Sequence, residues 1–143
     1  MKLYLDLGTK MGYALNDDGR IETGTVNFYN KPGDGKGARY LRFDNWLKTM
    51  SAVREVKYEI VLSHKGVYAA HCYGAFEGIL QAWCERGERA YEGVPVGTIK
   101  LRATGKGNAS KEMMIEAARA AGYNPVDDNE ADAIAIMLHF GGE

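Results

Sequence analysis

The sequence predicts an α/β fold in which a five-stranded mixed sheet carries helices on both faces. Three strand-like segments separated by turn residues occupy residues 2–28. From residue 38 onward, helix-like and strand-like segments alternate, and two helix-like segments end the chain. The predicted order is β-β-β-α-β-α-β-α-α. An antiparallel start, followed by strands that alternate with helices, is typical of a mixed sheet covered on both sides.

The first three strands are predicted over residues 2–7, 10–16 and 21–28. In the first of them, Leu3 and Leu5 alternate with more polar residues, which is the period of a strand. The Asp-Asp-Gly segment at residues 17–19 is a typical turn of a β-hairpin. These segments therefore predict a three-stranded meander.

Four helices and two further strands complete the prediction. Apolar residues recur at helical spacing in four segments, namely residues 38–53, 69–86, 110–121 and 129–140. Gly122 follows the third helix, at a position where helices commonly end. Residues 58–62 and 94–101 are predicted as the fourth and fifth strands.

Length and composition predict one globular domain over residues 1–143. The chain has a mass of 15.8 kDa and is 45% hydrophobic, which is sufficient for a core without disulfides. Cys72 and Cys84 lie about 18 Å apart along one predicted helix, so we expect free, buried thiols in a reducing compartment. No apolar run approaches the ~20 residues of a membrane span. We therefore expect a soluble, cytoplasmic protein, in the host cell if it is viral.

Charge is distributed unevenly along the sequence. The net charge of −1 argues against a strongly basic, histone-like nucleic-acid binder. Acidic residues are concentrated at 127–132, whereas residues 98–111 hold four basic residues and no acid. This pattern predicts an acidic metal pocket beside a phosphate-binding strip.

Three carboxylates are candidate metal ligands because of their positions: Asp6 late in the first strand, Glu59 in the fourth, and Asp132 in the last helix. Each also has an ordinary interpretation. Asp6 could cap a turn, Glu59 could face solvent and pair with Lys57, and Asp132 could complement the helix dipole. If the first and fourth strands are neighbours, however, two Mg²⁺ ions held by these acids could support phosphodiester hydrolysis.

Four segments together resemble the RuvC family of Holliday junction resolvases, including its phage-borne members, over nearly the whole chain. They are LDLGTKMGYAL, YEIVLSHKGVYAAHCYGAFEGIL, TIKLRATGKGNASKEMMIEAA and NEADAIAI, in the family's order. The last two are the most specific. The resemblance implies an RNase H-like fold and a metal-dependent, structure-selective endonuclease that cuts four-way or other branched DNA.

The resemblance also implies a set of metal ligands. It assigns Asp6, Glu59 and Asp132 to Mg²⁺ or Mn²⁺ binding. A fourth ligand is expected three residues before Asp132, where this chain has Asn129 in place of the usual Asp. An Asn carbonyl can coordinate but brings no charge. Asp128 or Glu130 could then compensate.

Basic residues are expected to contact DNA. The resemblance places Lys100 and Lys111 at its two lysine positions, where they imply phosphate contact or stabilisation of transition-state charge, with Lys111 in a catalytic role. Lys106, in a Gly-Lys-Gly loop, could also meet a phosphate. That loop lacks the spacing of a P-loop. Leu62 occupies the position of an aromatic residue in many family members, which argues against base stacking there.

Histidines give weaker signals. His64 and Lys65 follow the fourth strand on a loop that should open beside the metals, so they are DNA-contact candidates, although a solvated loop is the ordinary interpretation. His71 is more simply a structural histidine. The cysteines and histidines have no paired-ligand spacing, which disfavours zinc.

Family members dimerise through the helix that corresponds to residues 69–86, so a homodimer is expected, with two sites facing a symmetric junction. Two other enzymatic interpretations remain: an RNase H-like nuclease for RNA–DNA hybrids or flaps, and a sugar-kinase-like ATPase, whose two domains need a far longer chain. A third is a protein that binds branched DNA but cuts it poorly, because Asn129 and Leu62 depart from the family pattern.

Overall fold

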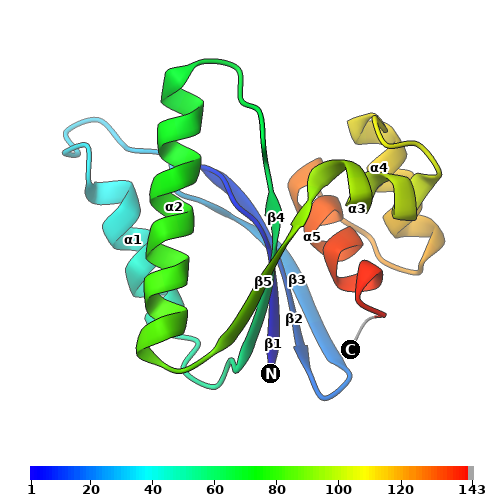
Figure 1. Cartoon of the computed structure of the whole chain (residues 1–143), viewed down its shortest axis with the longest axis horizontal. Helices are drawn as coiled ribbons and strands as arrows, with labels where there is room; N and C mark the ends of the chain where they lie inside the picture. The colour runs from blue at the N-terminus through cyan, green and yellow to red at the C-terminus, as the bar shows by residue number, and fades with distance from the viewer. Residues whose placement is uncertain (142–143) are drawn as a thin grey trace.

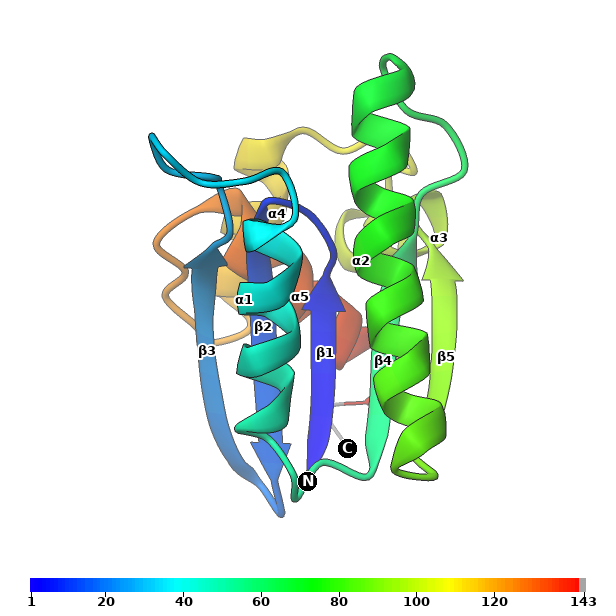
Figure 2. The ribbon, with the colours of Figure 1, turned by 90° about the vertical axis from the view of Figure 1, so that its left-hand side faces the viewer.

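The computed structural model of the chain describes residues 1–141 and contains the expected five-stranded mixed sheet. Its strands are β1 (Lys2–Asp6), β2 (Lys10–Asp17), β3 (Arg20–Asn27), β4 (Glu55–Ile60) and β5 (Ala90–Pro95). Their order across the sheet is β3-β2-β1-β4-β5 (Figure 2). β1, β2 and β3 pair antiparallel, whereas β4 lies parallel to both β1 and β5. The first and fourth strands are therefore neighbours, which is the condition that the carboxylate argument requires.

Helices cover both faces of the sheet (Figure 1). They are α1 (Ala38–Lys48) and α2 (Val67–Arg86) on one face, and α3 (Val96–Thr104), α4 (Lys111–Ala120) and α5 (Asp128–His139) on the other. Each face has its own hydrophobic core. Of the helices, α5 lies closest to the sheet and contacts four of its strands.

The alternation of side chains along β1 and β4 assigns the acids to one face. Leu5 belongs to the core beneath α1 and α2, whereas Tyr4 belongs to the core beneath α5. Because successive side chains point to opposite faces, Asp6 shares the α5 face with Tyr4. By the same period, Tyr58 points toward α2 and Glu59 points toward α5. Both strand acids therefore lie on the face that α5 covers.

The expected hairpin joins β2 to β3. Asp18 and Gly19 both have positive φ, 53° and 91°, as a two-residue turn of type I′ requires. The amide of Gly19 donates a hydrogen bond to Asn16 Oδ1 at 2.8 Å. The predicted Asp-Asp-Gly turn is confirmed.

The predicted strand over residues 94–101 is wrong for most of its length. Pairing with β4 begins at Ala90 and stops at Pro95, which has no N–H with which to extend the ladder. The following residues form α3, with Ile99 buried on its inner side, and Gly105 ends this helix at a φ of 81°. Residues 1–141 thus form five helices instead of the four expected, and Lys100 lies on a helix.

Two further elements end earlier than predicted, so the loops after them begin earlier. The fourth strand ends at Ile60, so Leu62 lies in the β4–α2 loop, and α1 ends at Lys48 instead of residue 53.

Cys72 and Cys84 are free and buried, as expected. Within residues 1–141, no helix combines the length and the apolar character needed to span a bilayer.

Candidate metal centre and nucleic-acid interface

Three carboxylates converge where β1, β4 and α5 meet. One oxygen from each of Asp6, Glu59 and Asp132 lies within 4.8 Å of the others. Glu59 is only 7% exposed, so the alternative interpretation, in which Glu59 faces solvent, is wrong. Lys57, the partner in that alternative, pairs instead with Glu55 and Glu92, at 3.1 and 2.8 Å.

A glycine in β2 lets α5 approach the sheet. Gly12 pairs with Asp6 across the β1–β2 ladder. A Cβ atom added at Gly12 would overlap with the backbone carbonyl of Asn129 in the first turn of α5. This close approach brings Asp132, one turn further along the helix, to the end of β1. The absence of a side chain at Gly12 therefore allows Asp132 to lie beside the acids of the sheet.

The start of α5 is fixed by two further acids. Asp127 is the N-cap and accepts hydrogen bonds from the Glu130 amide at 2.9 Å and from Thr25 Oγ1 at 2.8 Å. Glu130 is buried and accepts from the Val126 amide at 2.9 Å and from Thr23 Oγ1 at 2.6 Å. Glu130 is therefore engaged with β3 and the helix cap, and does not take the place of a missing ligand.

The electrostatics of the cluster favour a bound cation. Burial raises the pKa of Glu59 to about 7. Burial, together with the charges of Glu59 and Asp128, raises the pKa of Asp132 to about 7. The pKa of Asp6 is raised well above its ordinary value, chiefly by burial and then by Glu59 and Asp132. Close, buried carboxylates are costly unless a cation compensates them, and an all-oxygen donor set suits Mg²⁺ or Mn²⁺.

An acidic pocket with a volume of about 490 Å³ opens at the cluster; Asp6 and Asp132 line it, Glu59 does not, and it includes the expected fourth ligand position. Its polar lining comprises Asp6, Thr9, Lys10, Lys111, Asp127, Asp128, Asn129 and Asp132. Asn129 and Asp128 therefore both face the same space as Asp6 and Asp132. The negative charge of Asp128 also raises the pKa of both of these ligand candidates.

Two lysines flank the carboxylates. Lys111 is the first residue of α4, whose N-cap Ser110 accepts a hydrogen bond from the Met113 amide at 3.2 Å, and it lines the acidic pocket. Lys100 on α3 is close enough for its charge to lower the pKa of both Glu59 and Asp132. Lys100 therefore lies beside the acids, although it is on a helix and not on the predicted strand.

The other DNA-contact candidates lie outside the acidic pocket. Lys106 is exposed on the α3–α4 loop, and Lys65 is exposed on the β4–α2 loop. His64, on the same loop, packs against the Tyr73 ring with 5.0 Å between centroids. Leu62 is 82% exposed and contributes no aromatic surface there.

Tyr73 on α2 is a positioning residue that sequence reasoning missed. Its hydroxyl donates to the Glu59 carbonyl at 2.8 Å and accepts from the Val61 amide at 3.3 Å. These bonds fix the end of β4 and hence the backbone that carries the Glu59 side chain. Tyr73 lies in one of the four quoted segments, but nothing in one sequence connects this tyrosine to β4.

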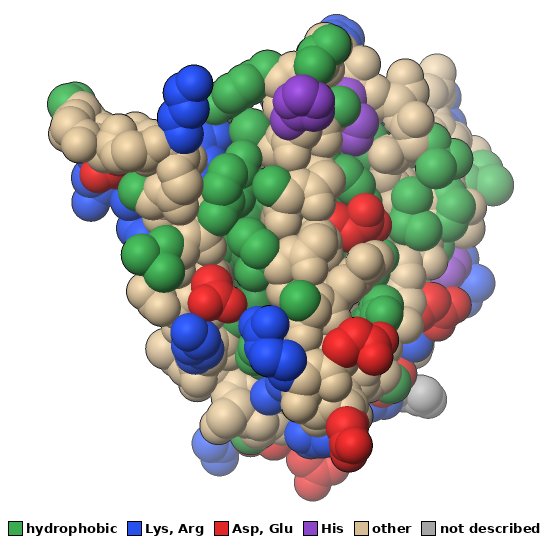
Figure 3. All heavy atoms as spheres, turned by 60° about the vertical axis from the view of Figure 1, so that its left-hand side comes forward, with side chains coloured by type: hydrophobic (Ala, Val, Ile, Leu, Met, Phe, Trp, Pro, Cys, Tyr) green, Lys and Arg blue, Asp and Glu red, His purple; other side chains and the backbone are tan. Residues whose placement is uncertain are grey.

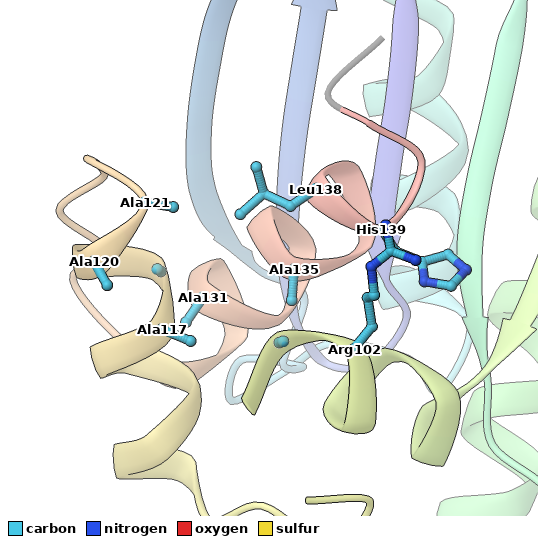
Figure 4. Close-up of a pocket in the computed structure, with 10 residues that line it drawn as sticks. Arg102, Ala117, Ala120, Ala121, Ala131, Ala135, Leu138 and His139 are labelled. Atoms are coloured by element: carbon cyan, nitrogen blue, oxygen red, sulfur yellow. The ribbon is translucent and has the colours of Figure 1, made fainter. Parts of the chain in front are cut away.

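A pocket of about 310 Å³ between α3, α4 and α5 has a different character (Figure 4). Alanines form most of its wall, with Arg102 and His139 at one side. None of the lining residues in the described part of the chain is a carboxylate. It is therefore separate from the acid cluster.

Comparisons with known proteins agree with this fold. No protein-family model and no curated protein matches the sequence. Among solved structures, Thermus thermophilus RuvC superimposes with a TM-score of 0.70 at 17% identity, over 98% of this chain and 96% of that one. T. thermophilus RuvC in complex with a Holliday junction gives 0.72 at 18% identity, over 96% and 90%.

The yeast mitochondrial Holliday junction resolvase Ydc2 gives a TM-score of 0.60 at 14% identity, covering 94% of this chain and 76% of that one. At these identities the likeness is one of fold. The chain therefore has the RNase H-like fold of the RuvC structures, as its sequence motifs predict.

Proposed function

We propose that this chain is a single RNase H-like nuclease domain, a homodimeric endonuclease that uses Mg²⁺ or Mn²⁺ to cleave phosphodiesters in four-way (Holliday) junctions or other branched DNA. The observation that carries the proposal is the convergence of Asp6, Glu59 and Asp132 from three separate elements to within 4.8 Å. The fold shared with RuvC, which has been solved in complex with a Holliday junction, supports the choice of substrate.

The proposed ligands are the three carboxylates of this cluster. Divalent ions held there supply water activation and neutralise charge on the attacking and leaving oxygens. The raised pKa values of Glu59 and Asp132 mean that protons compete with the metal below about pH 7. Cleavage should therefore be favoured at neutral to alkaline pH.

The two lysines have different proposed roles. Lys111 lines the acidic pocket from the start of α4, so its ammonium can stabilise charge that develops on the scissile phosphate. Lys100 already offsets the negative charge of Glu59 and Asp132, which suits a role in holding the phosphate close to the cluster. Lys106, Lys65 and His64 are proposed as contacts to more distant phosphates.

The fourth ligand position is proposed to be shared. Asn129 and Asp128 both line the pocket, and Asp128 supplies the negative charge that Asn129 lacks. Asp128 lies one turn before Asp132, so both side chains can reach the same side of α5. Restoring the usual acid with Asn129→Asp should therefore increase metal affinity, whereas Asp128→Asn should decrease it. Isothermal titration with Mn²⁺ measures both.

The proposed dimer interface is the outer side of α2. The exposed residues His71, Gly74 and Gly78 recur at helical spacing along this side. Cβ atoms added at Gly74 or Gly78 meet no atom within 4 Å, so the glycines leave open surface where a second helix can approach closely. Two copies related by a two-fold axis would present two sites to the symmetric strands of a junction.

The decisive experiment is cleavage of a labelled four-way junction in Mg²⁺, in Mn²⁺ and in EDTA, with linear duplex, flap and RNA–DNA hybrid as controls. Symmetric, metal-dependent nicks in the junction alone are expected. Preferential cutting of flap or hybrid would assign the chain to another nuclease class with this fold.

Asp6→Asn is the matched inactive variant, and Asp17→Asn, at the exposed end of β2, is its control. We expect Asp6→Asn to abolish cleavage and retain junction binding, and Asp17→Asn to behave like the wild type. Binding without cleavage by the wild type would instead indicate a DNA-binding protein with weak catalysis. Full activity of Asp6→Asn would remove Asp6 from the proposed site.

A further inference from the structure

A buried arginine without an ionic partner lines a pocket next to the acidic pocket. Arg39, in the first turn of α1, is only 6% exposed, and its Nη1 lies 3.4 Å from Cys72 Sγ. Its Nε is buried without a hydrogen-bond partner. Among residues 1–141, no carboxylate forms an ion pair with this guanidinium. Burial of an uncompensated charge is costly, so an anionic ligand would satisfy it.

Arg39 lines a pocket of about 480 Å³ that also has exposed aromatic surface. Tyr68 and Tyr29, on the wall of this pocket, are 70% and 51% exposed. The Arg39 guanidinium carbon lies 5.9 Å from the centroid of the Tyr68 ring. Histidine and hydrophobic side chains gather at this end of α2 on the surface (Figure 3). Exposed rings beside a cation suit a nucleotide, whose base stacks while its phosphate pairs with the guanidinium.

This pocket adjoins the acidic pocket. Leu7, Gly8, Thr9 and Tyr29 line both. A strand that places a phosphate at the acid cluster can therefore extend past the β1–β2 loop toward Arg39. Tyr68 shares a side of α2 with Cys72, which faces Arg39, and is offset from the Gly74 and Gly78 stripe proposed for dimerisation.

We infer that the Arg39 pocket binds one unstacked nucleotide of the DNA strand, adjacent to the phosphate at the acid cluster. Arg39 pairs with the phosphate of this nucleotide, and Tyr68 stacks on its base. The inference rests on the proposed nuclease function for the position of the strand. The pocket itself can be tested separately, with a single-stranded ligand that needs neither a junction nor cleavage.

The test is a titration of labelled oligothymidylate with the full chain, followed by fluorescence anisotropy. Tyr68→Ala should weaken binding about fivefold or more, because a stacking platform is lost. Tyr68→Phe keeps the ring and should bind like the wild type. Since Tyr68 is largely exposed, neither change should impair folding.

The second variant is Arg39→Met, which replaces the guanidinium with an apolar side chain. It should weaken binding about tenfold and reduce the salt slope of log affinity by about 0.7, the contribution of one single-strand phosphate contact. Its melting temperature should equal or exceed that of the wild type, because a buried charge without a partner is removed. Arg86→Met, at the opposite end of α2, removes one exposed charge as the control.

The outcomes separate the two proposals. Weaker oligothymidylate binding by Tyr68→Ala and Arg39→Met, with unchanged binding by Tyr68→Phe and Arg86→Met, supports the nucleotide pocket whether or not junctions are cleaved. Wild-type affinity in both test variants, or no oligothymidylate binding by the wild type, overturns it. If the wild type does not cleave junctions but the variants change oligothymidylate binding as expected, only the nuclease proposal is contradicted.

Discussion

Replacing Glu59 with glutamine tests whether the acid cluster is a destabilising site that needs a cation. Glu59 is only 7% exposed, and burial raises the pKa of its carboxyl group to about 7 from an ordinary 4.5. A change of this size corresponds to about 3 kcal/mol of folding free energy where the group is ionised. Glutamine has nearly the same shape and never ionises. In EDTA at pH 8, we therefore expect Glu59→Gln to be about 3 kcal/mol more stable than the wild type.

The sign of the pH dependence follows from proton linkage. The folded protein holds the Glu59 proton more tightly than the unfolded chain does, so folding takes up a proton between the two pKa values. Wild-type stability consequently falls as pH rises from about 4.5 to 7, and the loss is complete above that range. The advantage of Glu59→Gln should be largest at pH 8 and should disappear near pH 4.5.

Urea unfolding at pH 5 and pH 8, with EDTA present, measures this difference. The control is Glu112→Gln, an exposed acid on α4, for which we expect a small effect at both pH values. Mg²⁺ at about a hundred times its dissociation constant should stabilise the wild type by about 3 kcal/mol and should stabilise Glu59→Gln less. A variant less stable than the wild type at pH 8, or an advantage that does not depend on pH, would refute the reasoning.

Four further predictions concern packing, assembly and DNA. Gly78→Gln should give a monomer in light scattering with no loss of melting temperature, because the added side chain enters open space and improves helix propensity; a persistent dimer would contradict the α2 interface. Gly12→Ala should lower stability by about 3 kcal/mol or more in urea unfolding, since its Cβ overlaps with the α5 backbone, whereas Gly35→Ala should not. Lys111→Ala should slow single-turnover junction cleavage with little change in melting temperature, and an unchanged rate would remove its catalytic role. Junction affinity should fall with salt at a slope near −0.9 per phosphate contact on duplex arms, and a flat response would exclude phosphate anchoring.

Local signals were sufficient to predict most of the fold. The alternation in β1 and the Asp-Asp-Gly turn depend on neighbouring residues, and the structure contains both. The error at residues 94–101 arose where local signals conflict. Val94 continues the apolar strand, but Pro95 stops the ladder, and Ile99 is buried on the helix that follows. A strand at the sheet edge, such as β5, also has many exposed residues, so its true start at Ala90 carried no apolar pattern.

The candidate site was less predictable because its members are close only in three dimensions. The element order allowed the strands of Asp6 and Glu59 to be neighbours, and a resemblance in motifs assigned both residues as metal ligands. The contribution of Tyr73 did not, since it depends on where α2 passes the end of β4. The burial of Arg39, with its Nε left without a hydrogen-bond partner, was equally hard to predict, because an arginine at the start of a helix is ordinarily a solvated residue.

The two faces of the sheet are proposed to bind different parts of the DNA strand. The α5 face carries the carboxylates, whose burial makes them favour a cation. The α1–α2 face carries Arg39, whose burial makes it favour an anion. The β1–β2 loop, with Thr9 in both pockets, passes between these opposite charges. A strand bound across this loop would satisfy both faces at once, through metal ions on one side and a phosphate on the other, so metal and DNA should each increase the affinity for the other.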